Sequence, residues 1–379
     1  MDTGFARPQK GQFRHLGRVL YSVGLRMQNA MAEYVKDGDR PDQILFLEHN
    51  PVFTLGRSAN RADIHLAEGF LPIHGLEVHQ INRGGQVTYH GPGQIVVYPI
   101  CNLRRGRQDV NRLVYGLEQA MIETARSFGV ATDRIAGYPG VWVKTERGPE
   151  KLGAVGIHLR RWVSTHGIAF NLDPDMSHFQ WITPCGISEM GVCSLRTILG
   201  EGCPSWNMAS EYLARNISEM LAIEAMTVEE PSKSISATIW RRGTNGREVL
   251  VMMRNASEGQ GWSSVTGMVE DGETQEEAAH RKTLEETGLR GQLAHLGLQH
   301  TFWIDPVLTH IQPSESHKVD EPRFNTETCF HIEVPADSQV VMNRAEHGEY
   351  RWCAPEDAMQ LMSWEGSKTA LNTLARGWR

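Results

Sequence analysis

The chain has 379 residues, a formal net charge of −7 and 40% hydrophobic residues. This length exceeds what one ordinary core supports and predicts two domains. Charges of both signs are mixed along the chain, which argues against nucleic acid or a membrane surface as the partner. The N-terminal stretch lacks the apolar segment of a secretory signal, and no apolar run has the length of a membrane span. We therefore expect a cytoplasmic protein.

The first part of the chain mixes helical and extended patterns. Apolar spacing predicts helices over residues 19–35, 110–129 and 207–224, the second of them ended by Gly129. Residues 43–57 read as a strand, a turn and a second strand, and the apolar run 94–100 reads as a buried strand. Three successive strands follow over 140–144, 151–162 and 164–173. This pattern predicts an α+β domain with one sheet.

A seam follows at residues 229–234, where Pro231 and its polar neighbours are typical of a linker. We place one domain at 1–228 and a second at 235–379. In the second, 236–254 reads as two strands joined by a turn at 244–246. A helix is expected over 276–286, with Gly288 as its C-cap.

Chemistry in the first domain centres on one cysteine and one lysine. The six cysteines show no metal-ligand spacing, and in a reducing compartment we expect most of them to be buried free thiols. Cys185 differs because it lies between Pro184 and Gly186, on a tight turn. A thiol is nucleophilic as its thiolate, and an ammonium such as that of Lys151 would stabilise the thiolate. From the residues alone, a buried cysteine and a solvated surface lysine remain an equal alternative.

Three islands rich in glycine and reactive side chains contain this pair. They are RGGQVTYHGPGQ (83–94), KLGAVGIHLRRWVSTHGIAFNL (151–172) and ITPCGI (182–187). Glycine lets a ligand approach the backbone closely, and small residues on neighbouring strands leave a groove for an extended apolar chain. His90 either lies at the reacting group or caps the His-Gly-Pro-Gly turn.

Residues 15–225 resemble the octanoyltransferases of lipoate biosynthesis, the LipB family. RGGQVTYHGPGQ, the strand headed by Lys151, HGIAFNL, the Thr-Pro-Cys-Gly turn at 183–186 and LEHNPVFTLGR (47–57) match motifs of that family in the same order. The resemblance implies a biotin- and lipoate-ligase-like fold with no cofactor. It also implies octanoyl transfer from octanoyl-acyl carrier protein, through a thioester, to a lysine of lipoyl domains. Those domains belong to 2-oxoacid dehydrogenases and the glycine cleavage H protein.

The same resemblance implies roles for individual residues. Cys185 would be the nucleophile and Lys151 its partner, which also accepts the proton of the incoming amine. The octanoyl group would lie against three segments: Arg83, Gly84, Gly85, Gln86, Val87, Thr88, Tyr89 and His90; Ala154, Val155 and Gly156; Gly167, Ile168 and Ala169. The alternatives are a lipoate or biotin ligase, a cysteine hydrolase, and a lipoyl-protein binding module with an inactive cysteine. A ligase needs an adenylate loop, and a hydrolase needs a histidine base.

The second domain resembles Nudix hydrolases, which implies an α/β/α sandwich. The box positions Gly267, Glu273, Arg281, Glu285, Glu286, Gly288 and Leu289 match. GWSSVTG (261–267), residues 325–327 and residues 346–352 are similar to the dihydroneopterin triphosphate pyrophosphatases. This implies a pterin or nucleoside triphosphate as ligand, Arg254 and Thr266 as binding residues, and Mg²⁺ on Glu285, Glu286 and Glu346.

Two box positions depart from the pattern, Lys282 for glutamate and Thr283 for an apolar residue. Lys282 and Glu286 are four apart and are expected to pair. A charge pair at about 4 Å is worth roughly 4 kcal/mol at an effective dielectric constant of about 20, and a cation reverses the sign of that interaction for Mg²⁺. The domain is therefore either a weak pyrophosphohydrolase or a catalytically impaired module that senses a pterin or nucleotide.

Overall fold

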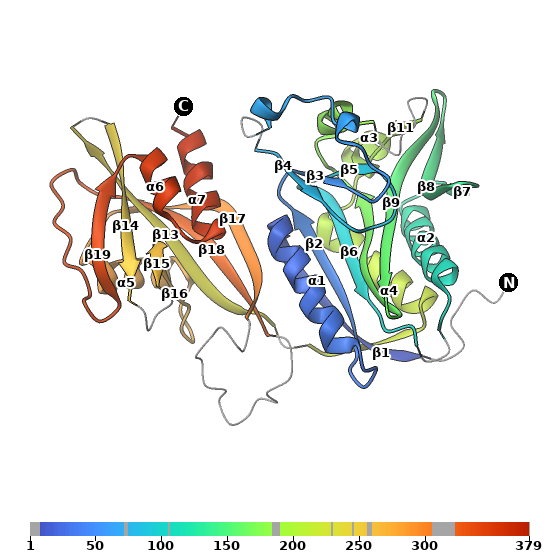
Figure 1. Ribbon diagram of the computed structural model, residues 1–379, viewed down its shortest axis with the longest axis horizontal. Helices are drawn as coiled ribbons and strands as arrows, with labels where there is room; N and C mark the ends of the chain where they lie inside the picture. Colours follow the sequence, from blue (N-terminus) through green and yellow to red (C-terminus); the bar gives the residue numbers. More distant parts are fainter. Residues whose placement is uncertain are drawn as a thin grey trace. The chain divides into compact units, whose positions relative to one another are not determined.

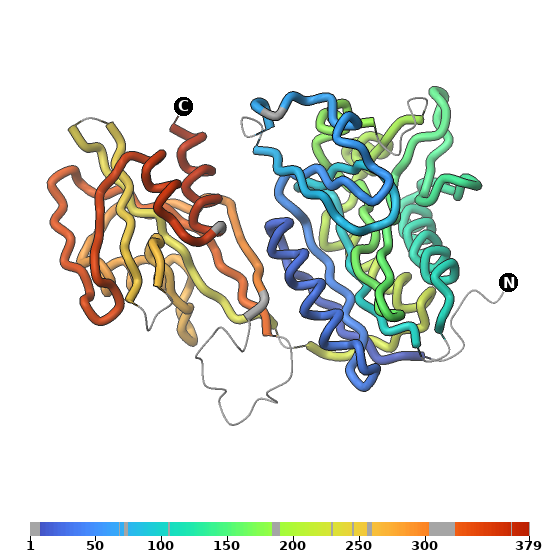
Figure 2. The backbone as a smooth tube through the Cα atoms, viewed as in Figure 1, coloured from blue at the N-terminus to red at the C-terminus, as the bar shows by residue number. Residues whose placement is uncertain are grey.

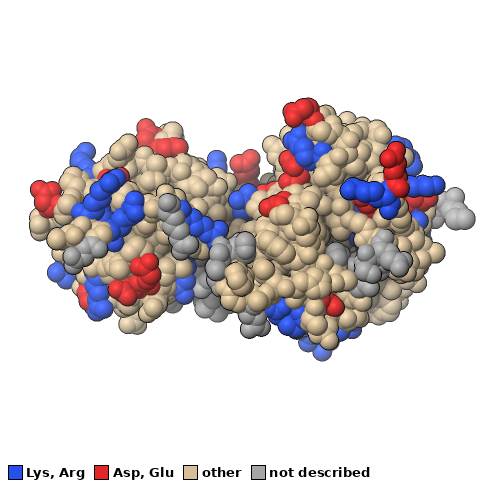
Figure 3. Space-filling model, turned by 90° about the horizontal axis from the view of Figure 1, so that it is seen from above, with Lys and Arg blue, Asp and Glu red and all other residues tan. Residues whose placement is uncertain are grey.

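The computed structural model describes residues 8–71, 75–104, 107–183, 190–228, 230–244, 246–255, 260–304 and 323–378. The chain divides into two compact units, residues 1–229 and 230–379. Each unit is a continuous stretch of sequence, as the colours of Figure 2 show. On the face shown in Figure 3, cationic and anionic side chains are interspersed with uncharged ones. None of the helices in the described ranges is both long and apolar enough to span a membrane.

The first unit is built around a mixed sheet that in the described residues has nine strands, in the order β12-β1-β2-β6-β10-β9-β8-β7, with β11 beside β9 (Figure 1). These strands are β1 (Gln9–Val19), β2 (Asp42–His49), β6 (Gln94–Ile100), β7 (Asp133–Ile135), β8 (Tyr138–Thr145), β9 (Gly148–Arg160), β10 (Val163–Asn171), β11 (Gly191–Val192) and β12 (Ile223–Met226). The helices are α1 (Tyr21–Val35), α2 (Val110–Ser127), α3 (Leu195–Leu199) and α4 (Trp206–Met220). Short 3₁₀ helices are η1 (Arg61–Asp63), η2 (Glu68–Phe70), η3 (Met176–Trp181) and η5 (Gly200–Gly202).

The expectation of a single sheet in this unit is wrong. Strands β3 (Val52–Leu55), β4 (Glu77–Gln80) and β5 (Val87–His90) form a separate three-stranded sheet. Pro51 ends the pairing of β2, because proline restricts the residue before it and donates no hydrogen bond. The small sheet has its own core, which includes Phe53, Val87 and Tyr89.

Helices cover both faces of the large sheet (Figure 1). The main core lies between the sheet and α2 with α4, where Leu117, Met121 and Leu213 are fully buried. Helix α1 packs on β10, β6 and β2 on the other face. The predicted helices, the strand pair at 43–57 and the fully buried strand 94–100 are confirmed. The third helix is shorter than expected, because it ends at Met220 and residues 223–226 form β12.

The second unit is an α/β/α sandwich, as the resemblance implied. In the described residues its sheet has the order β15-β14-β13-β18-β17, with β16 beside β13 and β19 beside β14. Its elements are β13 (Ser232–Gly243), β14 (Gly246–Arg254), β15 (Gly261–Ser263), β16 (Val265–Met268), α5 (Gln275–Thr287), β17 (Gln292–Ile304), β18 (Arg323–Glu333), β19 (His347–Cys353), α6 (Pro355–Leu361) and α7 (Glu365–Arg376). Strand β13 thus includes residues 232–234, which the sequence pattern assigned to the linker.

Alternating side chains on β14 explain the two layers. Leu250 and Met252 face the core under α5, whereas Val249 and Val251 face the core under α6 and α7. Helix α5 begins at a capping box in which Thr274 accepts a hydrogen bond from the backbone of Glu277. It ends at Gly288, whose φ of +69° confirms the predicted C-cap.

Candidate functional site

Cys185 lies in residues 184–189, outside the described residues, and so does the expected turn. The chain on either side of this segment is well placed. Before it, His65 Nε2 lies 2.8 Å from Thr183 Oγ1, and the backbone N–H of Thr183 donates to the carbonyl of Asp63. After it, β11 pairs with β9 in register, Val192 opposite Lys151, and the N–H of Cys193 donates to the carbonyl of Lys151. The chain that follows these residues therefore resumes beside Lys151.

Lys151 is buried, with 8% of its surface exposed. Its Nζ donates to the carbonyl of Pro139 at 3.1 Å and lies 4.6 Å from the centre of the Trp142 ring. Its Cε would lie 3.5 Å from a Cβ built on Gly140, so the side chain runs across that glycine. The alternative of a solvated surface lysine is wrong, because strand β9 holds this ammonium in the protein interior.

An extra residue in β9 decides which face Lys151 occupies. Val141 pairs with Gly153 but the next residue, Trp142, pairs with Lys151, so two residues of β9 advance against one of β8. A Cβ on Gly153 would meet the sulfur of Met121, so Gly153 faces α2. Lys151 consequently lies on the opposite face, together with Ala154, Gly156 and His158.

The Arg-Gly-Gly loop covers this face at Gly156. The N–H of Gly84 donates to the carbonyl of Ile157 at 3.2 Å, and a Cβ on Gly156 would come within 3.0 Å of Arg83 Cδ. Arg83 is itself buried and donates from Nη2 to Thr54 at the carbonyl (2.8 Å) and at Oγ1 (2.9 Å). The loop is thereby fixed between the small sheet and β9, as a wall over the small residues.

Several implied channel residues turn their side chains away from this groove. Val155 and Ile168 belong to the core under α2, and Val87 and Tyr89 belong to the core of the small sheet. A Cβ on Gly167 would meet the carbonyl oxygen of Val97 at 2.0 Å, so this glycine permits close approach of β10 to β6. Four of these residues therefore have side chains that pack in a core, and the fifth, Gly167, has a structural role in the sheet.

The remaining implied residues line the groove or its loop. Ala154 and Ala169 are paired across β9 and β10, and cross-strand partners share a face. Gly85 has a φ of +89°, which only glycine adopts readily. Gln86 accepts a backbone hydrogen bond from Gly56, and its buried Oε1 has no partner among the described residues. Thr88 lies on β5 opposite Thr54.

His90 is a buried neutral histidine that holds the turn. Its Nδ1 lies 2.7 Å from Gln94 Oε1, across the Gly-Pro-Gly turn, which matches the turn-capping alternative. Burial, with the neighbouring His49 second, lowers the pKa of His90 to about 3. Burial also lowers the pKa of His49 and of His166 to about 4. His49 bonds Tyr98 and the carbonyl of Val19, and His166 bonds Asn82.

These three histidines predict that the first unit is sensitive to mild acid. The pKa of each lies below the ordinary value of 6.5, so the unfolded chain binds more protons and stability is lost as pH falls from 6.5 toward 4. At pH 5 each histidine would cost about 2 kcal/mol relative to pH 7.5. Denaturant unfolding at several pH values should show an uptake of two to three protons on unfolding near pH 5. Hydrogen exchange of peptides from 43–100 then follows the same loss of stability in the segment that carries His49 and His90.

His166→Asn serves as the control for this prediction. Asparagine tolerates the left-handed backbone of this position, where φ is +57°. The variant should reduce the proton uptake by about one. A stability that stays flat between pH 7 and pH 5 would contradict the prediction.

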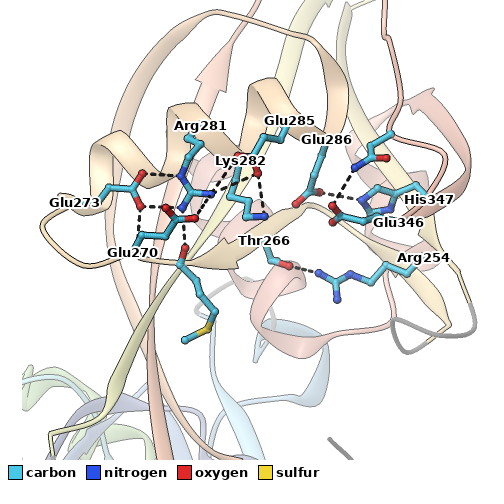
Figure 4. Close-up of polar contacts among 12 residues, drawn as sticks. Arg254, Thr266, Glu270, Glu273, Arg281, Lys282, Glu285, Glu286, Glu346 and His347 are labelled. Carbon is cyan, nitrogen blue, oxygen red and sulfur yellow. Dashed lines mark hydrogen bonds and ion pairs between the residues drawn. The ribbon is translucent and has the colours of Figure 1, made fainter. Parts of the chain in front are cut away.

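In the second unit three side chains converge at the end of α5. Glu286, Glu346 and His347 place one potential ligand atom each within 4.8 Å of one another (Figure 4). Glu286 and His347 are fully buried, and His347 Nε2 lies 2.9 Å from Glu286 Oε2. Burial raises the pKa of the Glu286 carboxyl, against the opposing hydrogen bond from His347. Glu286 Oε1 has no hydrogen-bond partner among the described residues, so this oxygen is available to a ligand.

Glu285 does not join this group, contrary to the implied metal site. Its carboxylate lies 3.0 Å from Lys282 Nζ and 3.4 Å from Arg281 Nη1, as Figure 4 shows. The expected pair between Lys282 and Glu286 is therefore wrong, because the i,i+3 partner Glu285 is exposed and within reach, whereas Glu286 is buried against His347. Bonding with Lys282 lowers the pKa of Glu285. His347 was not assigned from the sequence, although it directly follows Glu346.

Arg254 and Thr266, the implied binding residues, are brought together. An Arg254 nitrogen donates to Thr266 Oγ1 (Figure 4), and the guanidinium lies over the ring of Trp364 at 5.7 Å. Glu327, on β18, has its pKa raised to about 7 by burial. Arg281 joins the loop before α5 to the helix, donating from Nε and Nη2 to Glu273 at 2.8 Å each.

Comparisons with known proteins match both units. A family model for the lipoyl protein ligase A/B catalytic domain matches residues 21–218, and one for the NUDIX domain matches residues 233–374. An octanoyltransferase of Myxococcus xanthus is 37% identical over 354 residues, covering 93% of this chain and 95% of the relative. One of Acidobacterium capsulatum is 39% identical over 227 residues, covering 57% of this chain and 92% of the relative.

Two solved structures are similar to single units. A bi-partite lipoate protein ligase of Thermoplasma acidophilum has a TM-score of 0.45 at 14% identity, over 58% of this chain and 88% of that one. The dihydroneopterin triphosphate pyrophosphohydrolase of E. coli has a TM-score of 0.33 at 27% identity, over 40% of this chain and 99% of that one.

Proposed function

The chain belongs to the lipoyl protein ligase A/B catalytic family as an octanoyltransferase, with a NUDIX domain after it, and from this we propose a two-step transfer through Cys185. The Cys185 thiolate attacks the thioester carbonyl of octanoyl-acyl carrier protein, the carrier thiolate leaves and takes a proton from the Lys151 ammonium, and octanoyl-Cys185 forms. A lysine amine of a lipoyl domain then attacks this thioester, forming an amide and releasing the thiolate. Lys151, neutral after the first step, accepts the proton that the amine loses and is again the ammonium beside the thiolate.

The observation that carries this proposal is the position of Lys151. The extra residue in β9 turns the lysine toward the small residues that the Arg-Gly-Gly loop covers. After the segment with Cys185 the chain continues into β11, where Val192 pairs with Lys151. Both observations favour a thiol beside a buried ammonium. A ligase would adenylate a free acid and has no use for this pair.

Mass spectrometry tests the covalent step directly. The full chain is incubated with octanoyl-acyl carrier protein, quenched in acid and digested. We expect one octanoyl group on the peptide that carries Cys185. A peptide that stays unmodified while transfer proceeds would contradict the two-step route and favour direct transfer or a ligase.

Lys151→Met should raise the pKa of the Cys185 thiol toward about 8.5, because the ammonium that favours the thiolate is gone. The measurement is the rate of iodoacetamide alkylation of Cys185 against pH. Lys144→Met, an exposed lysine on β8, is the matched control and should leave the profile unchanged. Coincident profiles for wild type and Lys151→Met would show that another group activates Cys185.

We propose that the second unit binds a phosphate-containing ligand, such as a pterin or nucleoside triphosphate, with one divalent cation. Nudix hydrolases generally use divalent metals, and the buried Glu286 Oε1 fits such an ion. Glu286 and Glu346 would hold the cation, with His347 keeping Glu286 in place. The bound cation would neutralise phosphate charge, while Arg254 would bind a phosphate oxygen. The thermal shift of this unit with each triphosphate, with and without Mg²⁺, separates metal-dependent from metal-free binding.

A further inference from the structure

A buried carboxylate on α2 contacts the turn that holds Lys151. Glu118 is 7% exposed, and its Oε1 accepts a hydrogen bond from the backbone N–H of Gly140 at 2.7 Å. Its Oε2 accepts one from Arg134 Nε at 2.9 Å. Arg134 is itself held by the carbonyl of Tyr115 at 2.9 Å, with its guanidinium 3.8 Å from the centre of that ring. Both carboxylate oxygens are bonded, so Glu118 has a fixed position beside the start of β8.

The N–H that Glu118 binds belongs to the same peptide group as the carbonyl that binds Lys151. This group joins Pro139 to Gly140, and the Pro139 oxygen accepts from Lys151 Nζ at 3.1 Å. In a trans peptide group the C=O and the N–H point in opposite directions. One peptide group therefore has a carboxylate at its N–H end and an ammonium at its carbonyl end.

This peptide group connects the two faces of the large sheet. Helix α2 packs on the face of β9 that Gly153 occupies, and Lys151 lies on the opposite face. In a regular strand the peptide groups bond to neighbouring strands and would not join a helix to the far face. Gly140 departs from regular geometry with a φ of +121°, and a Cβ there would lie 2.4 Å from the carbonyl oxygen of Gly153. Glycine is therefore required where the peptide group turns out of the sheet.

The carboxylate decides which end of this peptide group faces the lysine. Glycine restricts the orientation of the peptide group before it only weakly, so the 139–140 group could turn over if nothing held it. Turned over, it would present its N–H to Lys151, whose ammonium has only donors to offer. Hydrogen bonds in a chain also polarise one another, so the bond from Gly140 to Glu118 strengthens the carbonyl as an acceptor. Glu118 thus controls both the orientation and the strength of the bond to the ammonium.

We propose that Glu118 is a positioning residue for octanoyl transfer, holding the Lys151 ammonium in place through the peptide group between Pro139 and Gly140. The inference rests on the proposed function, in which Lys151 exchanges protons at the Cys185 thioester. Glu118 is not itself a reacting group. It acts from the far face of the sheet by fixing where the ammonium lies.

Glu118→Leu tests this through the pH profile of Cys185 alkylation by iodoacetamide. We expect the midpoint to move to higher pH by at least about half of the shift that Lys151→Met causes, because the ammonium is no longer held beside the thiolate. In octanoyl transfer, kcat should fall at least about tenfold, with KM for octanoyl-acyl carrier protein nearly unchanged. Glu118→Gln keeps an oxygen acceptor for Gly140 and should restore most of both effects.

Two further variants distinguish positioning from a structural role. In the Lys151→Met background, Glu118→Leu should add no further shift to the alkylation profile, since the group that it positions is already gone. Glu123→Leu is the matched control. It removes another carboxylate of α2, paired with Arg126 at 2.6 Å, and should leave the profile and kcat as in the wild type.

The outcomes separate the inference from the proposed function. If Lys151→Met shifts the profile and Glu118→Leu does not, the positioning role is wrong and the transfer mechanism stands. If Lys151→Met itself causes no shift, the role of Lys151 in the proposed function is contradicted, and the inference with it. A shift from Glu118→Leu that persists in the Lys151→Met background would show that Glu118 acts by another route, which also overturns the inference.

Glu118→Asp replaces the leucine variant if that protein does not fold. Aspartate keeps the charge beside Arg134 but is one methylene shorter, which withdraws the carboxylate from Gly140. The midpoint should still move to higher pH, and an unchanged profile in a folded Glu118→Asp protein would overturn the inference.

Discussion

Cys185→Ala is expected to reduce octanoyl transfer from acyl carrier protein to a lipoyl domain by at least about a thousandfold. Removing the nucleophile removes both half-reactions, because neither the thioester nor its aminolysis can then occur. The groove remains, so binding of octanoyl-acyl carrier protein should change little. The measurement is a gel-shift or mass assay of lipoyl-domain octanoylation, with donor affinity determined separately.

Cys203→Ala is the matched control for this variant. Cys203 is a half-buried free cysteine of the same unit, and burial raises the pKa of its thiol. Its replacement should leave the transfer rate unchanged. If Cys185→Ala retained a tenth or more of the wild-type rate, an order-of-magnitude line, the covalent route would be wrong.

Lys282→Glu is expected to tighten Mg²⁺ binding by at least about tenfold, and to increase pyrophosphate release from dihydroneopterin triphosphate. The ammonium of Lys282 is 3.0 Å from Glu285 and neutralises that carboxylate. Glutamate at this position would replace a repulsive charge with an attractive one, which at an effective dielectric of about 20 is worth several kcal/mol at contact distance. Glutamate is as good a helix former as lysine, so α5 should persist.

Lys282→Gln separates the two parts of this effect. It removes the positive charge without adding a carboxylate, so its affinity for Mg²⁺ should lie between those of wild type and Lys282→Glu. Titration calorimetry with Mg²⁺ and a pyrophosphate assay measure all three proteins. Octanoyl transfer, which belongs to the other unit, should be the same in each.

Two outcomes would contradict this account. If wild type binds Mg²⁺ and hydrolyses as well as Lys282→Glu, then Lys282 does not impair the site. If none of the three proteins binds metal or ligand, the site has lost more than one residue. Glu286, Glu346 and His347 would then stabilise the unit without binding a ligand.

The sequence predicted the elements better than the details of the sites. Helical spacing and the glycine at 288 are local signals, and the structure confirms the elements that they define. The buried position of Lys151 is different, because it depends on an extra residue whose effect appears only when β8 and β9 pair. No local pattern distinguishes Leu152 from an ordinary strand residue.

Contacts between distant segments explain the other differences. The pairing of Lys282 with Glu285 depends on the burial of Glu286 against His347, a residue 61 positions away. Val155 and Ile168 were expected in the groove because their neighbours are small, yet strand alternation points both into the core. Gly167 looked like a gap for a ligand and is a contact with β6 instead. In each case composition suggested the site, and packing decided which side chains face it.

The extra residue in β9 makes strand register, rather than side-chain identity, a condition for activity. Inserting one residue into β8 between Val141 and Trp142 would leave Lys151 and every other motif residue in the sequence, but it would remove the bulge. Regular pairing would then put the lysine in phase with Gly153 and Val155, on the side packed against α2, since a shift of one residue exchanges the two faces of a strand. A relative could therefore carry an intact set of motifs and still be inactive, so the length of β8 opposite the bulge is as diagnostic as the residues themselves.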